Sequence, residues 1–246
     1  MSDQNDDGGD PSESGPQPVF LLPGVVTALA GLLVAIHLAA TFVLNSDSYL
    51  TFLQLFAYLP VRIPVALAED PTYALPLLWT PITHALLHDG WEHLLVNTAW
   101  LAIFATPVAR RYGASSTLLV FFASAVAGAA AFTITNLNEP AFLIGASGGV
   151  SGLTGAAVRF IFQPVLIGRD EETGQRVVLG RRLLSLGGIL QEPRARAFTL
   201  IWIGLNAAVP LLPAVFGISG IQIAWEAHLG GFIAGLLLAG WLERGQ

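Results

Sequence analysis

The chain has 246 residues, of which 54% are hydrophobic and only 11% are Asp, Glu, Lys or Arg. A soluble domain carries about 25% charged residues, so the composition excludes a soluble enzyme, a nucleic-acid-binding protein and a disordered protein. It predicts a protein that crosses a membrane several times. The formal net charge is −6, and the absence of cysteine excludes disulfides, iron–sulfur clusters and thiolate zinc sites.

Residues 1–19 form a polar, acidic segment rich in Gly, Pro and Ser. Such a segment cannot bury enough apolar surface to fold, so we expect a disordered tail. We do not expect a signal peptide, because the residues before the first apolar run are acidic rather than basic. Residues 20–246 are expected to form one membrane domain.

Six stretches are apolar and have about the 20 residues that a helix needs to cross a bilayer. They are residues 20–44, 91–108, 115–135, 147–163, 197–216 and 220–241. The sequence therefore predicts an all-α membrane protein, a bundle of six transmembrane helices.

Residues 45–83, between the first two spans, are apolar but are interrupted by five prolines. We expect a partly embedded loop at the membrane interface. The alternative is a seventh span over 50–68, which two prolines and Arg62 disfavour.

The arginines indicate how the spans are oriented. They follow the second span, occupy or flank the link of residues 164–196, or follow the last span, and Arg62 alone lies on the other side. The positive-inside rule then predicts a multi-pass plasma-membrane protein with cytoplasmic termini and a cytoplasmic 164–196 link. Within the link, residues 177–190 are expected to lie on the membrane surface as an amphipathic element. The second, fourth and sixth spans then start at the outer face.

Four polar residues lie in the outer halves of these three spans. His93 and Asn97 are four residues apart and share one face of the second span. Ser147 opens the fourth span, and His228 lies about 12 Å into the sixth. Ionisable groups inside a membrane are costly, so a hydroxyl, two imidazoles and an amide at similar depth indicate a functional site.

Glycines run along the fourth and sixth spans at helical spacing. Gly148, Gly152 and Gly155 lie on one face of the fourth span, and Gly231 and Gly235 on one face of the sixth. Small residues at this spacing let two helices approach closely. If the two faces meet, the serine and histidine of these spans come within hydrogen-bond reach.

A second Gly-x-Ser-Gly sequence occurs at 217–220. Its Ser219 is nine residues before His228, about 13 Å along the same helix, so the two cannot form a dyad. The first copy also fits the nucleophile-elbow pattern of soluble hydrolases, but that pattern requires a strand–turn–helix context. Ser147 is therefore the candidate nucleophile.

Metal binding is an alternative use of His84, His88 and His93. The HALLH sequence lacks the Glu of the H-E-x-x-H pattern, so it supplies no general base. We favour hydrogen-bonded structural roles for His84 and His88, and a packing role for His37.

The chain resembles the rhomboid family of intramembrane serine proteases over about residues 84–241. The matching elements are His84-x3-His88-x4-His93-x3-Asn97, then Gly145-Ala146-Ser147-Gly148, then Ala227-His228 followed by Gly231 and Gly235. Each element alone is modest, but their order, spacing and location in the second, fourth and sixth spans are highly specific.

The resemblance implies that Ser147 is the nucleophile and His228 the general base of a Ser-His dyad. It also implies an oxyanion hole built by His93, Asn97 and the Ser147 backbone amide, and no cofactor or metal. These roles agree with the chemistry, because a neutral imidazole can take the serine proton and return it to the leaving amine. Glu226 is expected on another helix face, which leaves a dyad without a carboxylate.

Three positions depart from the family pattern. Thr80 follows Trp79 where family members often have Trp-Arg, and Arg110-Arg111 keep only the arginine of a Glu-x-Arg element. Ser151 stands where a tyrosine often stacks on the catalytic histidine. These departures bear on loop rigidity and on the positioning of the histidine.

The resemblance further implies that the substrates are transmembrane segments of other membrane proteins, cut near the outer face. Membrane lipids are the other expected partner, and nucleic acid is not expected. Pro210 and Pro213 would loosen the fifth span, which we expect to move aside to admit substrate. Two alternatives stay open: an inactive relative that binds transmembrane segments, and a transporter or metal carrier, which would need paired broken helices.

Overall fold

The computed structural model describes residues 21–170, 173–209 and 223–244. The helices are α1 (Gly24–Val43), α2 (Ser46–Phe56), α3 (Arg62–Ala68), η1 (Pro71–Leu78), α4 (Thr80–Thr83), η2 (His84–Leu86), α5 (Trp91–Asn136), α6 (Ser147–Ile161), α7 (Leu186–Gln191), α8 (Pro193–Ala208) and α10 (Trp225–Glu243). Strands β1 (Val165–Arg169) and β2 (Arg176–Arg181) complete the described elements. The predicted tail over 1–19, Pro210, Pro213 and Ser219 lie outside the described residues.

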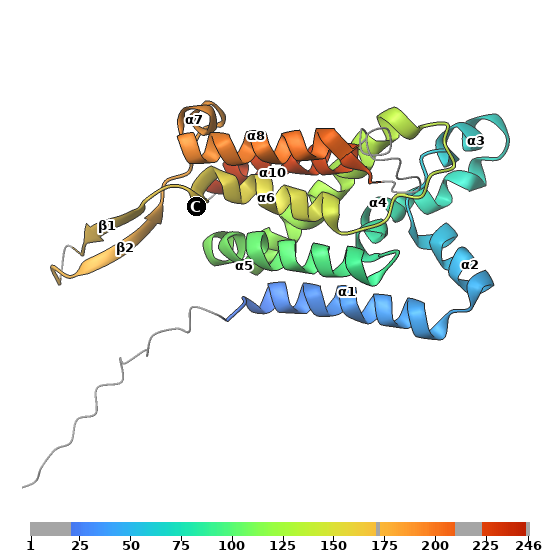
Figure 1. Ribbon diagram of the computed structural model, residues 1–246, viewed down its shortest axis with the longest axis horizontal. Helices are drawn as coiled ribbons and strands as arrows, with labels where there is room; N and C mark the ends of the chain where they lie inside the picture. The colour runs from blue at the N-terminus through green and yellow to red at the C-terminus, as the bar shows by residue number, and fades with distance from the viewer. Residues whose placement is uncertain (1–20, 171–172, 210–222, 245–246) are drawn as a thin grey trace, which may run out of the picture.

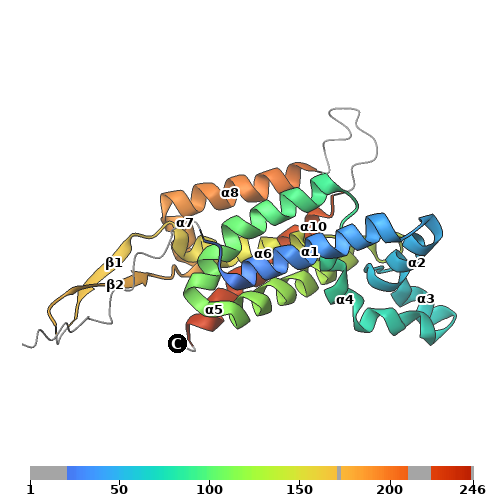
Figure 2. The ribbon, with the colours of Figure 1, turned by 90° about the horizontal axis from the view of Figure 1, so that it is seen from below.

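The long helices lie side by side along the longest axis of the molecule, with α2, α3 and α4 at one end and the β1–β2 hairpin at the other (Figures 1 and 2). Within the described ranges, α1, α5 and α10 are long and apolar enough to cross a membrane. The spans predicted at 91–108 and 115–135 are the two halves of the 46-residue α5, which meet at Gly113. The prediction of an all-α membrane bundle is confirmed.

The break in α5 depends on glycine. Gly113 has φ 79° and ψ 178°, a backbone conformation that residues with a side chain rarely adopt. The chain can therefore leave the first half of α5 and start the second within one residue.

The alternative of a seventh span over 50–68 is wrong, because that stretch holds two short helices. Helix α2 ends at Phe56 and α3 begins at Arg62, with Pro60 between them. A proline cannot donate the backbone hydrogen bond that a continuous helix would need there.

Side chains of residues 62–83 donate hydrogen bonds to the last backbone carbonyls of α2. Trp79 Nε1 donates a hydrogen bond to the Leu55 carbonyl at 2.7 Å, and Thr83 Oγ1 donates to the Phe56 carbonyl at 2.7 Å. The Arg62 guanidinium donates to the Gln54 carbonyl. Trp79 thus anchors this region without the Trp-Arg sequence that is frequent in the family.

The link over 164–196 contains a β-hairpin that the sequence pattern did not predict. Strands β1 and β2 pair antiparallel, from Val165 opposite Arg181 to Arg169 opposite Arg176. The amphipathic element expected at 177–190 is therefore divided between β2 and α7. A short apolar run such as Val177–Leu179 suits a strand as well as a helix.

Helix α6 lies at the centre of the bundle, between α5 and α10, and thirteen of its fifteen residues are buried. An added Cβ at Gly231 would lie 2.0 Å from the Gly148 carbonyl oxygen, and one at Gly235 would lie 1.8 Å from that of Gly152. No real side chain tolerates such distances, so only glycine permits this approach. The glycine faces predicted on the two spans do meet.

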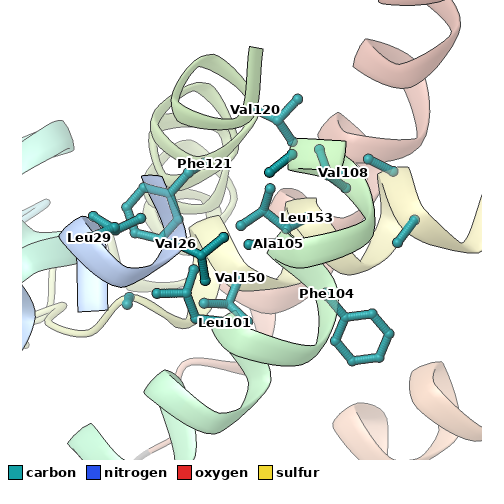
Figure 3. Close-up of a cluster of buried hydrophobic side chains, with 14 of the residues drawn as sticks. Val26, Leu29, Leu101, Phe104, Ala105, Val108, Val120, Phe121, Val150 and Leu153 are labelled. Atoms are coloured by element: carbon teal, nitrogen blue, oxygen red, sulfur yellow. The ribbon is translucent and has the colours of Figure 1, made fainter. Parts of the chain in front are cut away.

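Apolar side chains fill the space on the other side of α6. Val26 and Leu29 of α1 meet Leu101 and Phe121 of α5 and Leu153 of α6 in one buried cluster (Figure 3). Each of these side chains is less than 5% exposed. This cluster holds α6 in a fixed position, so the residue that opens α6 is held as well.

Candidate active site

Ser147 is the first residue of α6, as predicted, and its side chain is partly buried. The preceding Gly145 has φ +119°, and its N–H donates a 2.9 Å hydrogen bond to the His84 carbonyl. The backbone of the incoming loop is thereby held before the helix begins. At a helix N-terminus, the serine N–H has no partner within the helix and the helix dipole favours negative charge.

His228 lies in the first turn of α10, next to a residue of α10 that contacts the start of α6. A Cβ added at Gly148 would lie 3.6 Å from the Ala227 carbonyl oxygen. Because Ser147 and His228 directly adjoin these two contacting residues, the helix crossing brings the predicted nucleophile and base to one level of the bundle. No hydrogen bond of 3.5 Å or less joins the two side chains, and such bonds are often longer before substrate binds.

Asn206 of α8 is a partner of His228 that the sequence did not reveal. Its Oδ1 lies 2.7 Å from His228 Nδ1, and its Nδ2 donates to the Trp202 carbonyl at 2.8 Å. Since the carbonyl must accept, Nδ2 faces Trp202 and Oδ1 faces the imidazole. The imidazole proton therefore sits on Nδ1, which leaves Nε2 free to act as a base.

A second contact one turn away holds the same two helices together. The rings of Trp202 and Phe232 stack with centroids 4.3 Å apart and planes 17° apart. Trp202 is four residues before Asn206, and Phe232 is four residues after His228, so the two contacts share one face of each helix. The stack therefore supports the hydrogen bond to the imidazole.

His93 of α5 lies beside Gly145, in the loop that leads to Ser147. A Cβ added at Gly145 would be 2.7 Å from His93 Nε2 and 3.7 Å from Ser147 Oγ, so both groups border the same point. His93 Nδ1 is hydrogen-bonded to Asp89 Oδ1 at 2.6 Å. Because a carboxylate only accepts, Nδ1 carries a proton, and Nε2 can donate only when the ring is doubly protonated.

Asn97 is buried one turn further along α5, with 4% of its surface exposed. Its Nδ2 has no hydrogen-bond partner within the described part of the chain. A buried amide donor without a partner costs free energy, and such a donor is suited to an oxygen that arrives with a ligand.

His37 and His88 line a cavity of about 300 Å³ together with Tyr49 and Asp89. The ring nitrogens of both histidines lack hydrogen-bond partners among the described residues. The expected hydrogen-bonded role is therefore wrong for His88, which contacts the His93 ring edge-on at 5.0 Å. Burial and the nearby Asp89 charge raise the pKa of Tyr49 above its usual value.

The part of the chain that the structure describes contains no cluster of side chains that supports metal binding. Across 21–170, 173–209 and 223–244 there is no group of three or more His, Asp or Glu side chains that could hold an ion. His84 is buried and serves the site through its carbonyl, which accepts from Gly145.

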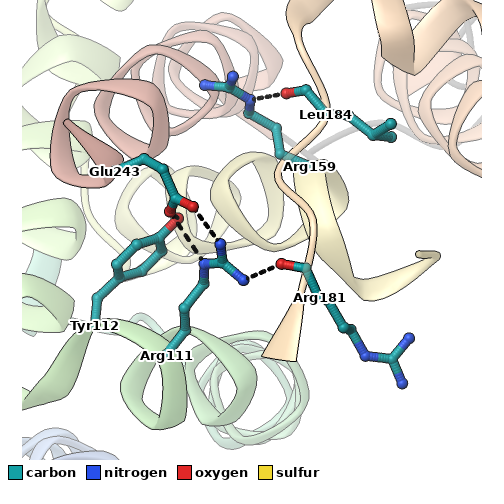
Figure 4. Close-up of polar contacts among 6 residues, drawn as sticks. All are labelled: Arg111, Tyr112, Arg159, Arg181, Leu184 and Glu243. Carbon is teal, nitrogen blue, oxygen red and sulfur yellow. Dashed lines mark hydrogen bonds and ion pairs between the residues drawn. The ribbon is translucent and has the colours of Figure 1, made fainter. Parts of the chain in front are cut away.

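The carboxylates of Glu226 and Glu243, both in α10, form hydrogen bonds with residues other than His228. Glu226 accepts a 2.9 Å hydrogen bond from Thr135 Oγ1 of α5, as expected for a residue facing away from the histidine. At the opposite end of the bundle, Glu243 receives Arg111 Nη2 at 2.6 Å and Tyr112 Oη at 3.1 Å (Figure 4). The last turn of α10 thus supplies the carboxylate that the Glu-x-Arg pattern would have supplied locally.

These helices and the polar side chains at their crossing define a helical membrane protein with a hydroxyl, imidazoles and amides gathered inside the bundle. A family model described as the Rhomboid domain matches residues 76–244. The chain belongs to the rhomboid family.

Curated relatives that the chain matches carry the name "Rhomboid protease GlpG". The chain is 30% identical to the protein of Yersinia pestis over 168 residues, which is 68% of this chain and 49% of that protein. It is 30% identical to the protein of Pectobacterium atrosepticum over 165 residues, 67% of this chain and 48% of that protein. The chain therefore spans about half the length of the curated relatives it matches.

Proposed function

We propose that the protein is an intramembrane serine endopeptidase that hydrolyses peptide bonds in or near transmembrane segments of other membrane proteins. The observation that carries the proposal is the glycine-mediated crossing of α6 and α10, which adjoins both Ser147 and His228. Membership in the rhomboid family and the likeness to proteins named proteases support it.

In the proposed mechanism, His228 Nε2 takes the proton of Ser147 Oγ as the oxygen attacks the substrate carbonyl. The peptide C–N bond then breaks as His228 returns the proton to the leaving amine, and water hydrolyses the acyl-enzyme by the same steps in reverse order. Asn206 keeps the Nδ1 proton in place through each step, because its Oδ1 accepts from both the neutral and the charged ring.

The oxyanion is proposed to form between α5 and the start of α6. The backbone N–H of Ser147, Asn97 Nδ2 and His93 Nε2 are the donors, and His93 donates in its doubly protonated form, with Nδ1 bonded to Asp89. Loss of one such donor lowers the rate by about 10²- to 10³-fold in serine proteases.

The substrate is proposed to reach the site from the lipid, at the end of the bundle where α6 begins. By the positive-inside rule this is the outer face of the plasma membrane, because the arginines concentrate at the other end. Helix α8 carries exposed Leu200, Ile201 and Leu205 and is the proposed mobile helix at the entrance.

The test compares the wild-type protein with Ser147→Ala in detergent, using a labelled transmembrane substrate. We expect cleavage to disappear in the variant and a fluorophosphonate probe to label the wild type at Ser147 alone. Ser219→Ala is the matched control, since it alters the second Gly-x-Ser-Gly copy and should retain full activity. Cleavage that persists in Ser147→Ala would refute the mechanism.

A further inference from the structure

A second cavity lies at the end of the bundle opposite Ser147. It has a volume of about 780 Å³ and is bounded by the end of α6, the last turns of α10, the base of the hairpin and the segment leading to α7. Neither the proposed peptidase chemistry nor the resemblance to the family assigns a role to it.

Charge in this cavity is strongly one-sided. Among the residues that the structure describes, its lining contains one acidic residue, Glu243, and five arginines: Arg111, Arg159, Arg181, Arg182 and Arg244. Glu243 forms a bidentate ion pair with Arg111 (Figure 4). The other four guanidinium groups therefore have no carboxylate of the lining left to neutralise them.

Two of these four arginines donate hydrogen bonds to backbone carbonyls. Arg159 is 8% exposed and donates to the carbonyls of Leu184 and Leu236, both at 2.8 Å. Arg181 donates to the carbonyls of Ile161 and Gln163. Carbonyl dipoles orient a cation but do not cancel its charge, so a half-enclosed group of this kind favours an anion nearby.

The remaining two arginines, Arg182 and Arg244, are exposed at the rim. Neither guanidinium group forms a hydrogen bond or ion pair with another described residue. They directly follow β2 and α10, so the fold brings them together from 62 residues apart in the sequence. Both are available to an anionic ligand without breaking an existing contact.

The same cavity is also lined by apolar side chains, whose exposure to water is unfavourable. Trp241 is 60% exposed and Leu237 is 56% exposed, one turn apart on α10, and Leu166 and Leu179 add the apolar base of the hairpin. Tryptophan at the end of a spanning helix is typical of the membrane–water boundary. A ligand that fits must carry both an anionic head and an apolar body.

We propose that this cavity binds an acidic phospholipid, with its phosphate held by Arg159, Arg182 and Arg244 and its acyl chains against Leu237 and Trp241. Basic pockets between spanning helices on the cytoplasmic side bind anionic headgroups in this way. The apolar wall favours a lipid over a free phosphate, which would leave Trp241 unused.

The experiment measures lipid retained by the whole protein, so its result does not depend on peptidase activity. The protein is purified from mixed phosphatidylglycerol and phosphatidylcholine vesicles, and bound lipid is counted by native mass spectrometry. We expect preferential retention of phosphatidylglycerol, reduced about 30-fold in the double variant Arg182→Gln/Arg244→Gln. The matched control is Arg169→Gln/Arg176→Gln, which removes the same charge from the hairpin outside the cavity and should change retention less than threefold.

A third variant separates the lipid from a free anion. Trp241→Ala is expected to reduce phosphatidylglycerol retention while leaving the binding of inorganic phosphate unchanged. The proposal is overturned if the two lipids are retained equally, if the double variant and the control behave alike, or if inorganic phosphate displaces the lipid at equal concentration. An unchanged thermal transition in each variant establishes that the protein is folded.

Discussion

The hydrogen bond between Asn206 and His228 is expected to set the efficiency of the proposed base. In Asn206→Leu the Nδ1–H of the imidazole loses its acceptor, and the ring is free to rotate or to move its proton to Nε2. Either change removes the lone pair that would receive the serine proton. Asn206→Leu is therefore expected to slow the attack of Ser147 itself.

The magnitude follows from the contacts at this position. A neutral hydrogen bond contributes about 0.5–1.5 kcal/mol, and an N–H left unpaired in a partly buried site costs about the same again. The sum, about 1–3 kcal/mol, corresponds to about a 5- to 150-fold decrease in kcat. KM is expected to change less than about threefold, because Asn206 contacts the imidazole and the backbone of its own helix.

The assay is the rate at which a fluorophosphonate labels Ser147, measured beside cleavage of a transmembrane substrate. A small probe does not require α8 to move, so slow labelling reports activation of the serine rather than entry of substrate. Asn206→Asp keeps an acceptor and should retain activity within a few-fold of the wild type. Trp202→Leu is the control for the docking of α8, because it removes the stack on Phe232 and leaves the hydrogen bond.

Labelling of Asn206→Leu at a rate within twofold of the wild type would refute the reasoning. So would an equal loss in Trp202→Leu and Asn206→Leu, because the effect would then come from the seating of α8 and not from the imidazole tautomer.

Two further substitutions examine the parts that position the site. Gly235→Ala is expected to destabilise the protein by more than about 3 kcal/mol and to abolish labelling, because the added Cβ would lie 1.8 Å from a carbonyl oxygen of α6. Gly31→Ala is its control, since nothing lies within 4 Å of the new Cβ. In that variant the helix is expected to become more stable by about 0.5–1 kcal/mol. Equal unfolding midpoints for the two variants would contradict the packing argument. Asp89→Ala removes the carboxylate bonded to His93 and is expected to lower kcat by about tenfold or more, measured with the same substrate at neutral pH. Glu92→Ala removes the same charge from the neighbouring helical turn and should have little effect, so matching losses in the two acidic variants would exclude a specific role for the His93 pair.

Much of the fold can be predicted from the sequence because the membrane imposes simple requirements. A spanning helix needs about 20 apolar residues and satisfies its own backbone, so α1 and the two halves of α5 appear in the pattern without knowledge of their neighbours. Ser147 at the start of α6 and the glycine faces of α6 and α10 are also visible locally, since helical periodicity alone puts those glycines on one side.

The hairpin over 165–181 could not be predicted on the same grounds. Its strands are short, and segments such as Val177–Arg181 suit either a strand or an amphipathic helix. The choice depends on antiparallel pairing with β1, a contact between segments that the pattern of neither one specifies.

By itself, the sequence determined that this is a helical membrane protein, which residues of its spans are polar, and which helix faces can approach closely. Only the tertiary structure decided which polar residues become partners, Asn206 with His228 and Glu243 with Arg111, and that Arg182 and Arg244 line one cavity. The physical reason is the range of each interaction. Apolar burial and backbone hydrogen bonding act along a helix and leave a periodic pattern, whereas a hydrogen bond between two side chains depends on an alignment of helices within tenths of an ångström.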